Sequence, residues 1–226
     1  MPEFSENSLN LLLKKIWVNY TYPQILNNVL REIPLKNDNP LLCLCFVWSP
    51  WVWKSTIAKM ISEKIWIYIA SNDKIRRILE SYGIDSMNHQ NIVEKFVLDR
   101  AIYLLENHTN MIIDANVLTS YQKIEHILKQ YNSTWLFIYL ECSESIILQR
   151  LKVRKDILGT ESCGYSAGTI DDYYNFKESE KKSPFPDEKI FFKIDTGNNV
   201  QEQVEALIEK ILKLFNMQNF QYNRHK

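Results

Sequence analysis

The chain has 226 residues with 27 basic and 27 acidic side chains, so its formal net charge is zero, and 46% of its residues are hydrophobic. This length suits one globular domain with some appended structure, and the zero net charge counts against obligate binding to nucleic acid or to a membrane surface. The longest apolar run, Leu41 to Trp48, is far shorter than the roughly 20 residues that a membrane helix needs. We therefore expect a cytoplasmic protein with one main domain.

The first part of the chain divides near Pro40. Apolar residues recur at helical spacing in two segments before this proline, which predicts an N-terminal helical extension over residues 1–39. The main domain, predicted over residues 40–216, begins with Leu41 to Val47, a continuous apolar run typical of a strand buried on both faces. The polar segment 217–226 is expected to be a flexible tail.

Within the main domain, short apolar runs alternate with segments of helical periodicity. The predicted helices are residues 55–64, 73–82, 92–105, 119–131, 143–155 and 200–215, and the strands after the first are residues 65–70, 111–113, 135–140 and 189–194. Residues 156–188 indicate only loops and a short helix. Such alternation predicts an α/β fold with a parallel sheet, whose ligands bind beyond the carboxyl ends of the strands, near residues 48–56, 71–76, 114–116 and 195–197.

The four cysteines include no C-x-x-C pair. Cys43 and Cys45 are two apart in the first strand, so their thiols share one face of it. We expect buried free thiols, with metal ligation as the alternative.

The turn after the first strand reads Trp-Ser-Pro-Trp-Val-Trp-Lys-Ser-Thr at residues 48–56. It matches G-x-x-G-x-G-K-S-T with each glycine replaced by tryptophan, and it lies between a strand and a helix, as the phosphate-binding motif G-x-x-x-x-G-K-[ST] requires. Glycine is needed there because the loop uses positive φ angles and its amides close around phosphate oxygens. Read literally, Trp48, Trp51 and Trp53 block a phosphate.

Three explanations compete for these tryptophans. With 6 tryptophans in 226 positions, chance would put three on the three glycine sites about once in 100,000 sequences. A decayed pseudoenzyme would scatter its substitutions over many residue types. A third explanation is the codon UGA, which different translation tables read as stop, tryptophan or glycine; it also accounts for a glycine count of only 5 and for Trp66 between helix and strand, whereas Trp17 and Trp135 fit either residue.

If the loop binds phosphates, Lys54 reaches the β- and γ-phosphates, Ser55 contacts Mg²⁺ and Thr56 adds a phosphate contact. A lysine at a helix start is electrostatically misplaced unless an anion lies there, which favours this function over a solvated side chain. Asp114 ends an apolar strand, where an aspartate can hold Mg²⁺ or simply terminate the strand.

Two further pairs of residues are candidates. Asp73 and Arg76 share one helical face, where the carboxylate could take the proton of an attacking hydroxyl and the arginine could bind an anionic acceptor; a surface ion pair is the alternative. Arg150 and Arg154 are four apart, so they could clamp the transferring phosphates or only complement the end of their helix.

At these residues the chain resembles the P-loop ATP-dependent kinases that include the polynucleotide kinase, zeta-toxin and small-molecule phosphotransferase groups. The motifs are the loop at 48–56, Ser-x-Asp-x-x-Arg at 71–76, Ile-Asp-Ala-Asn at 113–116, Arg-x-x-x-Arg at 150–154 and Ile-Asp-Thr at 194–196. Asp-Ala-Asn at 114–116 is one residue shorter than the commoner form, and Lys123 replaces an arginine. The resemblance implies a three-layer P-loop NTPase fold with a central, mainly parallel sheet, with Asp73 as general base, Arg150 and Arg154 as lid arginines, and Thr196 near the adenine.

We therefore predict an ATP- and Mg²⁺-dependent kinase that transfers the γ-phosphoryl group to a hydroxyl of a small molecule or of a nucleic-acid end, the latter disfavoured by the neutral charge. Lys54, Asp73, Arg150 and Arg154 are the predicted catalytic residues, Asp73 and Arg76 bind the acceptor, and Ser55 and Asp114 hold the metal. The predicted nucleotide-binding residues are Trp48, Ser49, Pro50, Trp51, Val52, Trp53, Lys54, Ser55, Thr56 and Thr196. The alternative is a non-catalytic binding protein whose phosphate loop is filled by the three tryptophans.

Overall fold

The computed structural model describes residues 24, 41–48, 52–84, 90–114, 121–158 and 169–215. Apart from residue 24, the predicted N-terminal helical extension lies outside the described residues, and so does the polar tail. The start of the helix predicted at residue 119 lies outside them as well.

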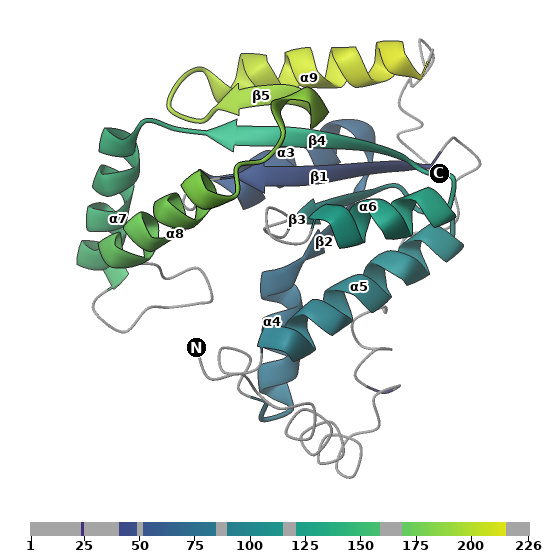
Figure 1. Ribbon diagram of the computed structural model, residues 1–226, viewed down its shortest axis with the longest axis horizontal. Coiled ribbons are helices and arrows are strands. Elements are labelled where there is room, and N and C mark those ends of the chain that lie inside the picture. The colour runs from purple at the N-terminus through teal and green to yellow at the C-terminus, as the bar shows by residue number, and fades with distance from the viewer. Residues whose placement is uncertain are drawn as a thin grey trace.

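Five strands form one sheet in which every neighbouring pair is parallel, in the order β2-β3-β1-β4-β5 (Figure 1). The strands are β1 (Leu42–Trp48), β2 (Tyr68–Ser71), β3 (Met111–Asp114), β4 (Thr134–Glu141) and β5 (Ile190–Asp195). The α/β class and the parallel sheet expected from the sequence are confirmed. In a parallel sheet all carboxyl ends lie at one edge, so the ends of these strands and the turns after them form a common surface.

Helices cover both faces of the sheet (Figure 1). The helices are α3 (Lys54–Ile65), α4 (Asn72–Ser81), α5 (Gln90–Glu106), α6 (Tyr121–Gln130), α7 (Glu144–Leu158), α8 (Ile170–Lys182) and α9 (Val200–Leu214), with the short 3-10 turn η1 (Asp187–Lys189) before β5. Helices α3 and α9 pack on one face, α5 and α6 pack on the other, and α7 and α8 stand beyond the carboxyl ends of the strands.

The central strand β1 is buried on both faces, as its continuous apolar run predicts. Leu42, Leu44 and Phe46 point to the face covered by α3 and α9, and the residues between them point to the opposite face. Cys43 and Cys45 therefore share a face, with 3.8 Å between their Sγ atoms, and both are free, buried thiols. Burial raises the pKa of the Cys43 thiol, so it packs as a small apolar side chain.

Two predicted boundaries were wrong. The second strand begins at Tyr68 and not at residue 65, because Ile65 is still helical and Trp66 takes a left-handed conformation that ends α3. Residues 156–188 also contain more helix than expected: α7 continues to Leu158, and α8 is a regular helix of 13 residues.

The length of helix α8 was underestimated because its sequence has little apolar periodicity and the helix depends on tertiary contacts. Tyr173 is its only described side chain that is fully buried. Lys177 of α8 pairs with Glu144 of α7, and Glu180 accepts a hydrogen bond of 2.9 Å from the Tyr139 hydroxyl on β4. These partners are far apart in the sequence, so the local pattern of apolar residues cannot predict the contacts between them.

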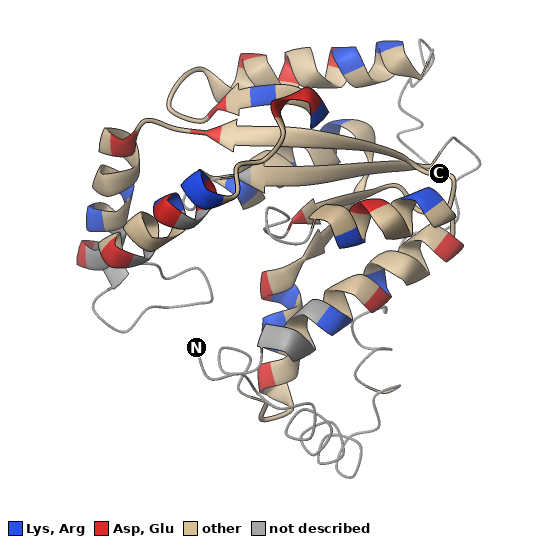
Figure 2. Ribbon diagram, in the orientation of Figure 1, with Lys and Arg blue, Asp and Glu red and all other residues tan. Residues whose placement is uncertain are grey.

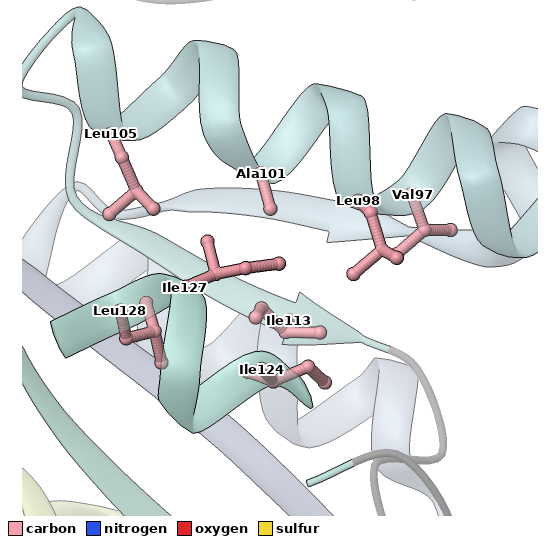
Figure 3. A pocket seen from close by; sticks show the side chains of 8 residues that line it. All are labelled: Val97, Leu98, Ala101, Leu105, Ile113, Ile124, Ile127 and Leu128. Carbon is pink, nitrogen blue, oxygen red and sulfur yellow. The ribbon is translucent and has the colours of Figure 1, made fainter. Parts of the chain in front are cut away.

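A small apolar cavity of about 20 Å³ lies between α5, α6 and β3 (Figure 3). Side chains from both helices point into it from opposite sides, and Ile113 of β3 forms its floor. The lining residues are Val97, Leu98, Ala101, Leu105, Ile113, Ile124, Ile127 and Leu128. Because no polar atom lines the cavity, its wall offers a water molecule no hydrogen-bond partner.

Charged side chains lie mainly on the helices and at the ends of strands, and β1 carries none (Figure 2). Both basic and acidic residues lie on the helices, in agreement with the zero net charge. Among the described residues, no helix combines the length and the apolar character required to cross a membrane.

Leu128→Ala is expected to lower the free energy of unfolding by about 2–5 kcal/mol, toward the upper end of that range, because the deletion enlarges a cavity that already exists. The control is Leu214→Ala in α9, where the leucine is 53% exposed and the expected change stays within about 0.5 kcal/mol. Urea unfolding of both variants measures the difference, and equal stabilities would contradict this description of the core.

Candidate functional site

The surface at the carboxyl ends of the strands collects most of the predicted site residues. Strand β1 leads into α3 and Lys54, β3 ends at Asp114, β2 leads into α4 and Asp73, and β5 ends just before Thr196. Because β3 and β1 are neighbours in the sheet, Asp114 and the start of α3 are brought together although 60 residues separate Lys54 from Asp114.

Asp114 is the most buried charged residue of this surface, with 2% of its side chain exposed. The Lys54 ammonium lies 2.9 Å from Asp114 Oδ1 as an ion pair, and it donates a hydrogen bond of 3.2 Å to the Asp114 carbonyl. The Ser55 hydroxyl donates to Asp114 Oδ2 at 3.1 Å. The carboxylate thus has a compensating charge and a hydrogen bond, as a buried charge requires.

Trp53 immediately precedes α3 in a left-handed conformation, with φ 55° and ψ 31°. This region is open to glycine at no cost, whereas a bulky residue rarely adopts it. The indole is 53% exposed, so no burial in a core holds it in place. Trp48 closes β1, its side chain is not among those described, and Ser49, Pro50 and Trp51 lie outside the described residues.

Arg150 of α7 joins the turn before α3 to the end of β5. Its Nη1 donates to Thr196 Oγ1 at 3.1 Å and its Nη2 donates to the Thr196 carbonyl at 2.6 Å. The guanidinium carbon also lies 4.2 Å from the centre of the Trp53 ring. Arg150 is therefore directed at Thr196 and Trp53; the side chain of Arg154, its predicted companion, lies outside the described residues.

Asp73 and Arg76 lie on the first turns of α4, as predicted, and both are half-buried. Burial lowers the pKa of the Arg76 guanidinium, while the carboxylates of Asp73 and Glu80 act in the opposite direction. No described contact joins Asp73 to Lys54 or Asp114, so the structure places this pair on the same sheet edge as the Asp114 cluster without linking the two.

The turn after β5, residues 195–198, is held by a contact that the sequence analysis did not foresee. The side-chain amide of Gln203 accepts a hydrogen bond from the Asp195 amide at 2.8 Å and donates one to the Asp195 carbonyl at 2.9 Å. Gln203 occupies a position in the apolar stripe of α9, three residues after Val200 and next to Val204. A polar residue in such a stripe is the sequence signal that could have identified it.

The remaining tryptophans described by the structure fall into two classes. Trp66 follows α3 at φ 51° and ψ 51°, its amide donates to the Ser62 carbonyl at 2.9 Å, and it is 69% exposed, which is the geometry of a glycine at a helix end. Trp135 lies inside β4, pairs with Cys43 across the sheet and packs against the core, with Lys129 Nζ 6.0 Å from its ring. Position 66 thus suits glycine, and position 135 suits tryptophan.

These residues form a site with a defined chemistry. A lysine, a serine hydroxyl and a buried carboxylate converge where β1 meets α3, and the oxygen atoms of Ser55 and Asp114 are ligands that suit Mg²⁺. The start of α3 presents backbone amides and the positive end of the helix dipole, which favour an anion. At the position before this helix start, the Trp53 ring lies 4.2 Å from the guanidinium carbon of Arg150.

No family model matches the chain, and no curated protein matches it. Solved structures share its fold. A putative kinase from Chloroflexus aurantiacus matches with a TM-score of 0.60 at 13% identity, covering 78% of this chain and 98% of that one. The APS kinase CysC from Mycobacterium tuberculosis, in complex with AMPPNP and APS, matches with a TM-score of 0.50 at 10% identity, covering 76% and 98%.

A third match comes from the PezAT toxin–antitoxin system of Streptococcus pneumoniae, with a TM-score of 0.51 at 12% identity, covering 96% of this chain and 98% of that one. The chain thus has the fold of P-loop kinases, as its motifs led us to expect. At these identities the similarity shows the fold alone.

In protein that carries tryptophan at position 66, Trp66→Gly is expected to raise the free energy of unfolding by about 1 kcal/mol, because the left-handed conformation costs an L-residue about 1–2 kcal/mol and the exposed indole contributes little packing. The control is Trp135→Gly, which removes a packed side chain from a strand and should destabilise by at least about 2 kcal/mol. Thermal unfolding of the two variants measures both changes. A loss of stability at position 66 would refute the assignment of glycine there.

Proposed function

We propose that the protein is an ATP-dependent kinase that transfers the γ-phosphoryl group to a hydroxyl of an acceptor. The observation that carries this proposal is the cluster formed by Lys54, Ser55 and Asp114 at the start of α3. Lysine, serine and a strand-end aspartate are the side chains that a phosphate-binding loop uses, and here they lie within hydrogen-bond distance of one another. The fold shared with P-loop kinases supports the same conclusion.

Lys54 is proposed to bind the β- and γ-phosphates. In the structure its charge is compensated by Asp114, which explains how a lysine remains stable at a helix start without an anionic ligand. A bound triphosphate offers Lys54 a second anionic partner. The backbone amides of residues 49–56 and the Thr56 hydroxyl complete the proposed phosphate contacts.

Ser55 and Asp114 are proposed to hold Mg²⁺ together. Their oxygen atoms are 3.1 Å apart and are joined by a hydrogen bond that the cation would replace. When bound, Mg²⁺ neutralises part of the charge that develops on the phosphates during transfer.

Asp73 is proposed as the general base and Arg76 as the ligand of an anionic group on the acceptor. They share one face of α4, which follows the carboxyl end of β2. In the sheet, β3 lies between β2 and β1, the strand that leads into the proposed phosphate loop. The Asp73 carboxylate can accept the proton of the attacking hydroxyl, and a half-buried guanidinium gains from an anionic partner. The acceptor class is therefore an anionic molecule with a free hydroxyl; a nucleic-acid end remains an alternative, which the neutral net charge disfavours.

Thr196 and Arg150 are proposed to lie on the nucleotide side of the site, with Arg154 acting on the phosphates from the same helix. The Arg150 guanidinium spans the gap between the phosphate loop and the end of β5, so nucleotide binding there brings it close to the phosphates. A planar guanidinium can shift its donors from Thr196 to phosphate oxygens as negative charge develops on them.

The proposal requires glycine at positions 48, 51 and 53. The left-handed backbone at Trp53 and Trp66 supports a common cause, in which one codon has been read as tryptophan where the organism inserts glycine. We infer that the codons at positions 48, 51, 53 and 66 are UGA and that the codon at 135 is UGG. UGG at 48, 51 and 53 would refute this inference.

The second candidate function is that of a non-catalytic binding protein with a kinase fold. The contact between the Arg150 guanidinium and the Trp53 ring favours it, because a cation over an indole is a stabilising pair that fills the phosphate approach. In that case the loop cannot close around a phosphate.

Titration calorimetry with Mg-ATP separates the two functions. The form with glycine at 48, 51 and 53 is expected to bind with an affinity in the range of about 1 μM–1 mM that is usual for enzyme substrates, and the form with three tryptophans is expected not to bind. The mass of the protein purified from its own source shows which form exists. Absence of binding by the glycine form would remove the kinase proposal.

In the glycine form, Asp73→Asn is expected to lower kcat for phosphoryl transfer by about 10²–10⁴-fold with little change in KM for ATP, because the general base is lost and the phosphate loop is untouched. Screening hydroxyl acceptors with labelled ATP first supplies the assay. Glu209→Gln, which removes a 71% exposed carboxylate from α9, serves as the control. Full activity of Asp73→Asn would exclude its role as base.

A further inference from the structure

Beyond the residues that face the bound nucleotide, the structure points to Gln203 as a positioning residue. We propose that Gln203 fixes the turn at residues 195–198, through which Thr196 and Arg150 are placed against the nucleotide. This inference rests on the proposed ATP site at the carboxyl ends of the strands.

The argument begins with the edge of the sheet. Among the strands that the structure describes, β5 has a neighbour only on one side, so none of them pairs with the outward backbone groups of its last residue. The Asp195 N–H and C=O both point to this open side, because the next amide, that of Thr196, points inward and donates to the Glu141 carbonyl on β4 at 2.8 Å. The backbone of Asp195 therefore offers one hydrogen-bond donor and one acceptor on the side of β5 that faces away from β4.

Gln203 matches that pair in full. Its side-chain oxygen accepts from the Asp195 amide at 2.8 Å, and its side-chain nitrogen donates to the Asp195 carbonyl at 2.9 Å. A primary amide has the donor and acceptor of a peptide group, so Gln203 acts as one residue of an additional strand. Neither a carboxylate nor a shorter amide can reproduce both bonds from the same position.

The Asp195 side chain continues the constraint into the turn. Its Oδ1 accepts the Gly197 amide at 2.8 Å, and its Oδ2 accepts the side-chain amide of Asn198. Gly197 packs so closely that an added Cβ would lie 2.8 Å from the Ile146 side chain. Three elements thus contact the turn. Gln203 of α9 binds its first residue, Glu141 of β4 binds Thr196, and Ile146 of α7 packs against Gly197.

Thr196, at the centre of this turn, is 2% exposed and receives both hydrogen bonds from Arg150. The position of the Arg150 guanidinium over residue 53 therefore depends on where the turn places Thr196. A displacement of the turn moves Arg150 relative to the phosphate loop while leaving Lys54, Ser55 and Asp114 in place. Loss of Gln203 should consequently weaken nucleotide binding more than the chemical step.

The test compares Gln203→Ala with Gln201→Ala in the glycine form of the full chain. Gln201 lies in the same turn of α9, but its amide contacts the exposed Glu205 carboxylate and not the turn after β5. Gln203→Ala is expected to raise KM for ATP about three- to tenfold at a kcat within about twofold of the parent, as the loss of two hydrogen bonds implies, and Gln201→Ala is expected to change neither constant.

Hydrogen exchange of the Asp195 amide, measured by NMR, supplies a readout that is independent of catalysis. In Gln203→Ala this amide should exchange at least about tenfold faster than in the parent, with the amides of β1 unchanged. Unchanged exchange at Asp195, or a fall in kcat at constant KM, would overturn the role of Gln203. A parent protein that neither binds nor uses ATP would contradict the kinase function instead, and the exchange at Asp195 would still decide whether Gln203 holds the turn.

Discussion

The buried carboxylate of Asp114 is the constraint on which the candidate site depends. A charge that is 98% removed from solvent is tolerated only with a counter-charge and hydrogen-bond donors, and Lys54 and Ser55 supply both. They can do so because β3 lies beside β1 in a parallel sheet, which brings the end of one strand to the helix that follows the other. The electrostatics of the site and the topology of the sheet therefore require each other: with β1 and β3 apart, Asp114 would be an uncompensated charge in the core.

The turn between β1 and α3 adds a conformational requirement to this electrostatic one. To begin α3 at Lys54, the chain reverses through a left-handed residue at position 53, and it ends the same helix through another at position 66. An L-residue with an indole side chain opposes both conformations. The strand-to-helix connection therefore requires a backbone conformation at position 53 that glycine adopts far more readily than tryptophan.

Much of the fold follows from the sequence because its signals are local. The apolar runs at 41–47 and 135–140 could be recognised as buried strands, and the stripe of α9 could be recognised as a helix that covers one face. The regular helix α8 could not, because it is held by the buried Tyr173, by one ion pair with α7 and by one hydrogen bond with β4. The strand order could not be predicted from the sequence either, because it depends on pairing between segments that are far apart in the chain.

The residues of the candidate site also differ in whether local sequence signals or long-range contacts place them. Lys54, Ser55 and Asp114 were predictable because the spacing of a motif and the end of a strand place them. The direction of the Arg150 side chain was not, because its partner Thr196 lies 46 residues away and belongs to another element. Gln203 could have been predicted as a structural residue, because it is a polar residue in the apolar stripe of α9. Arg100 of α5 is a second buried polar residue among apolar ones, and its guanidinium lies over the Tyr68 ring.

The internal pairing of the site has a consequence for ligand binding. The Lys54 ammonium is paired with the Asp114 carboxylate, and the Arg150 guanidinium donates two hydrogen bonds to the uncharged Thr196. A phosphate ligand therefore exchanges existing contacts for new ones, and only the difference between them contributes to affinity. Side chains that are already held in place lose less entropy when a ligand binds to them. A turn that fixes Thr196 therefore also fixes the Arg150 guanidinium beside residue 53, at the start of α3.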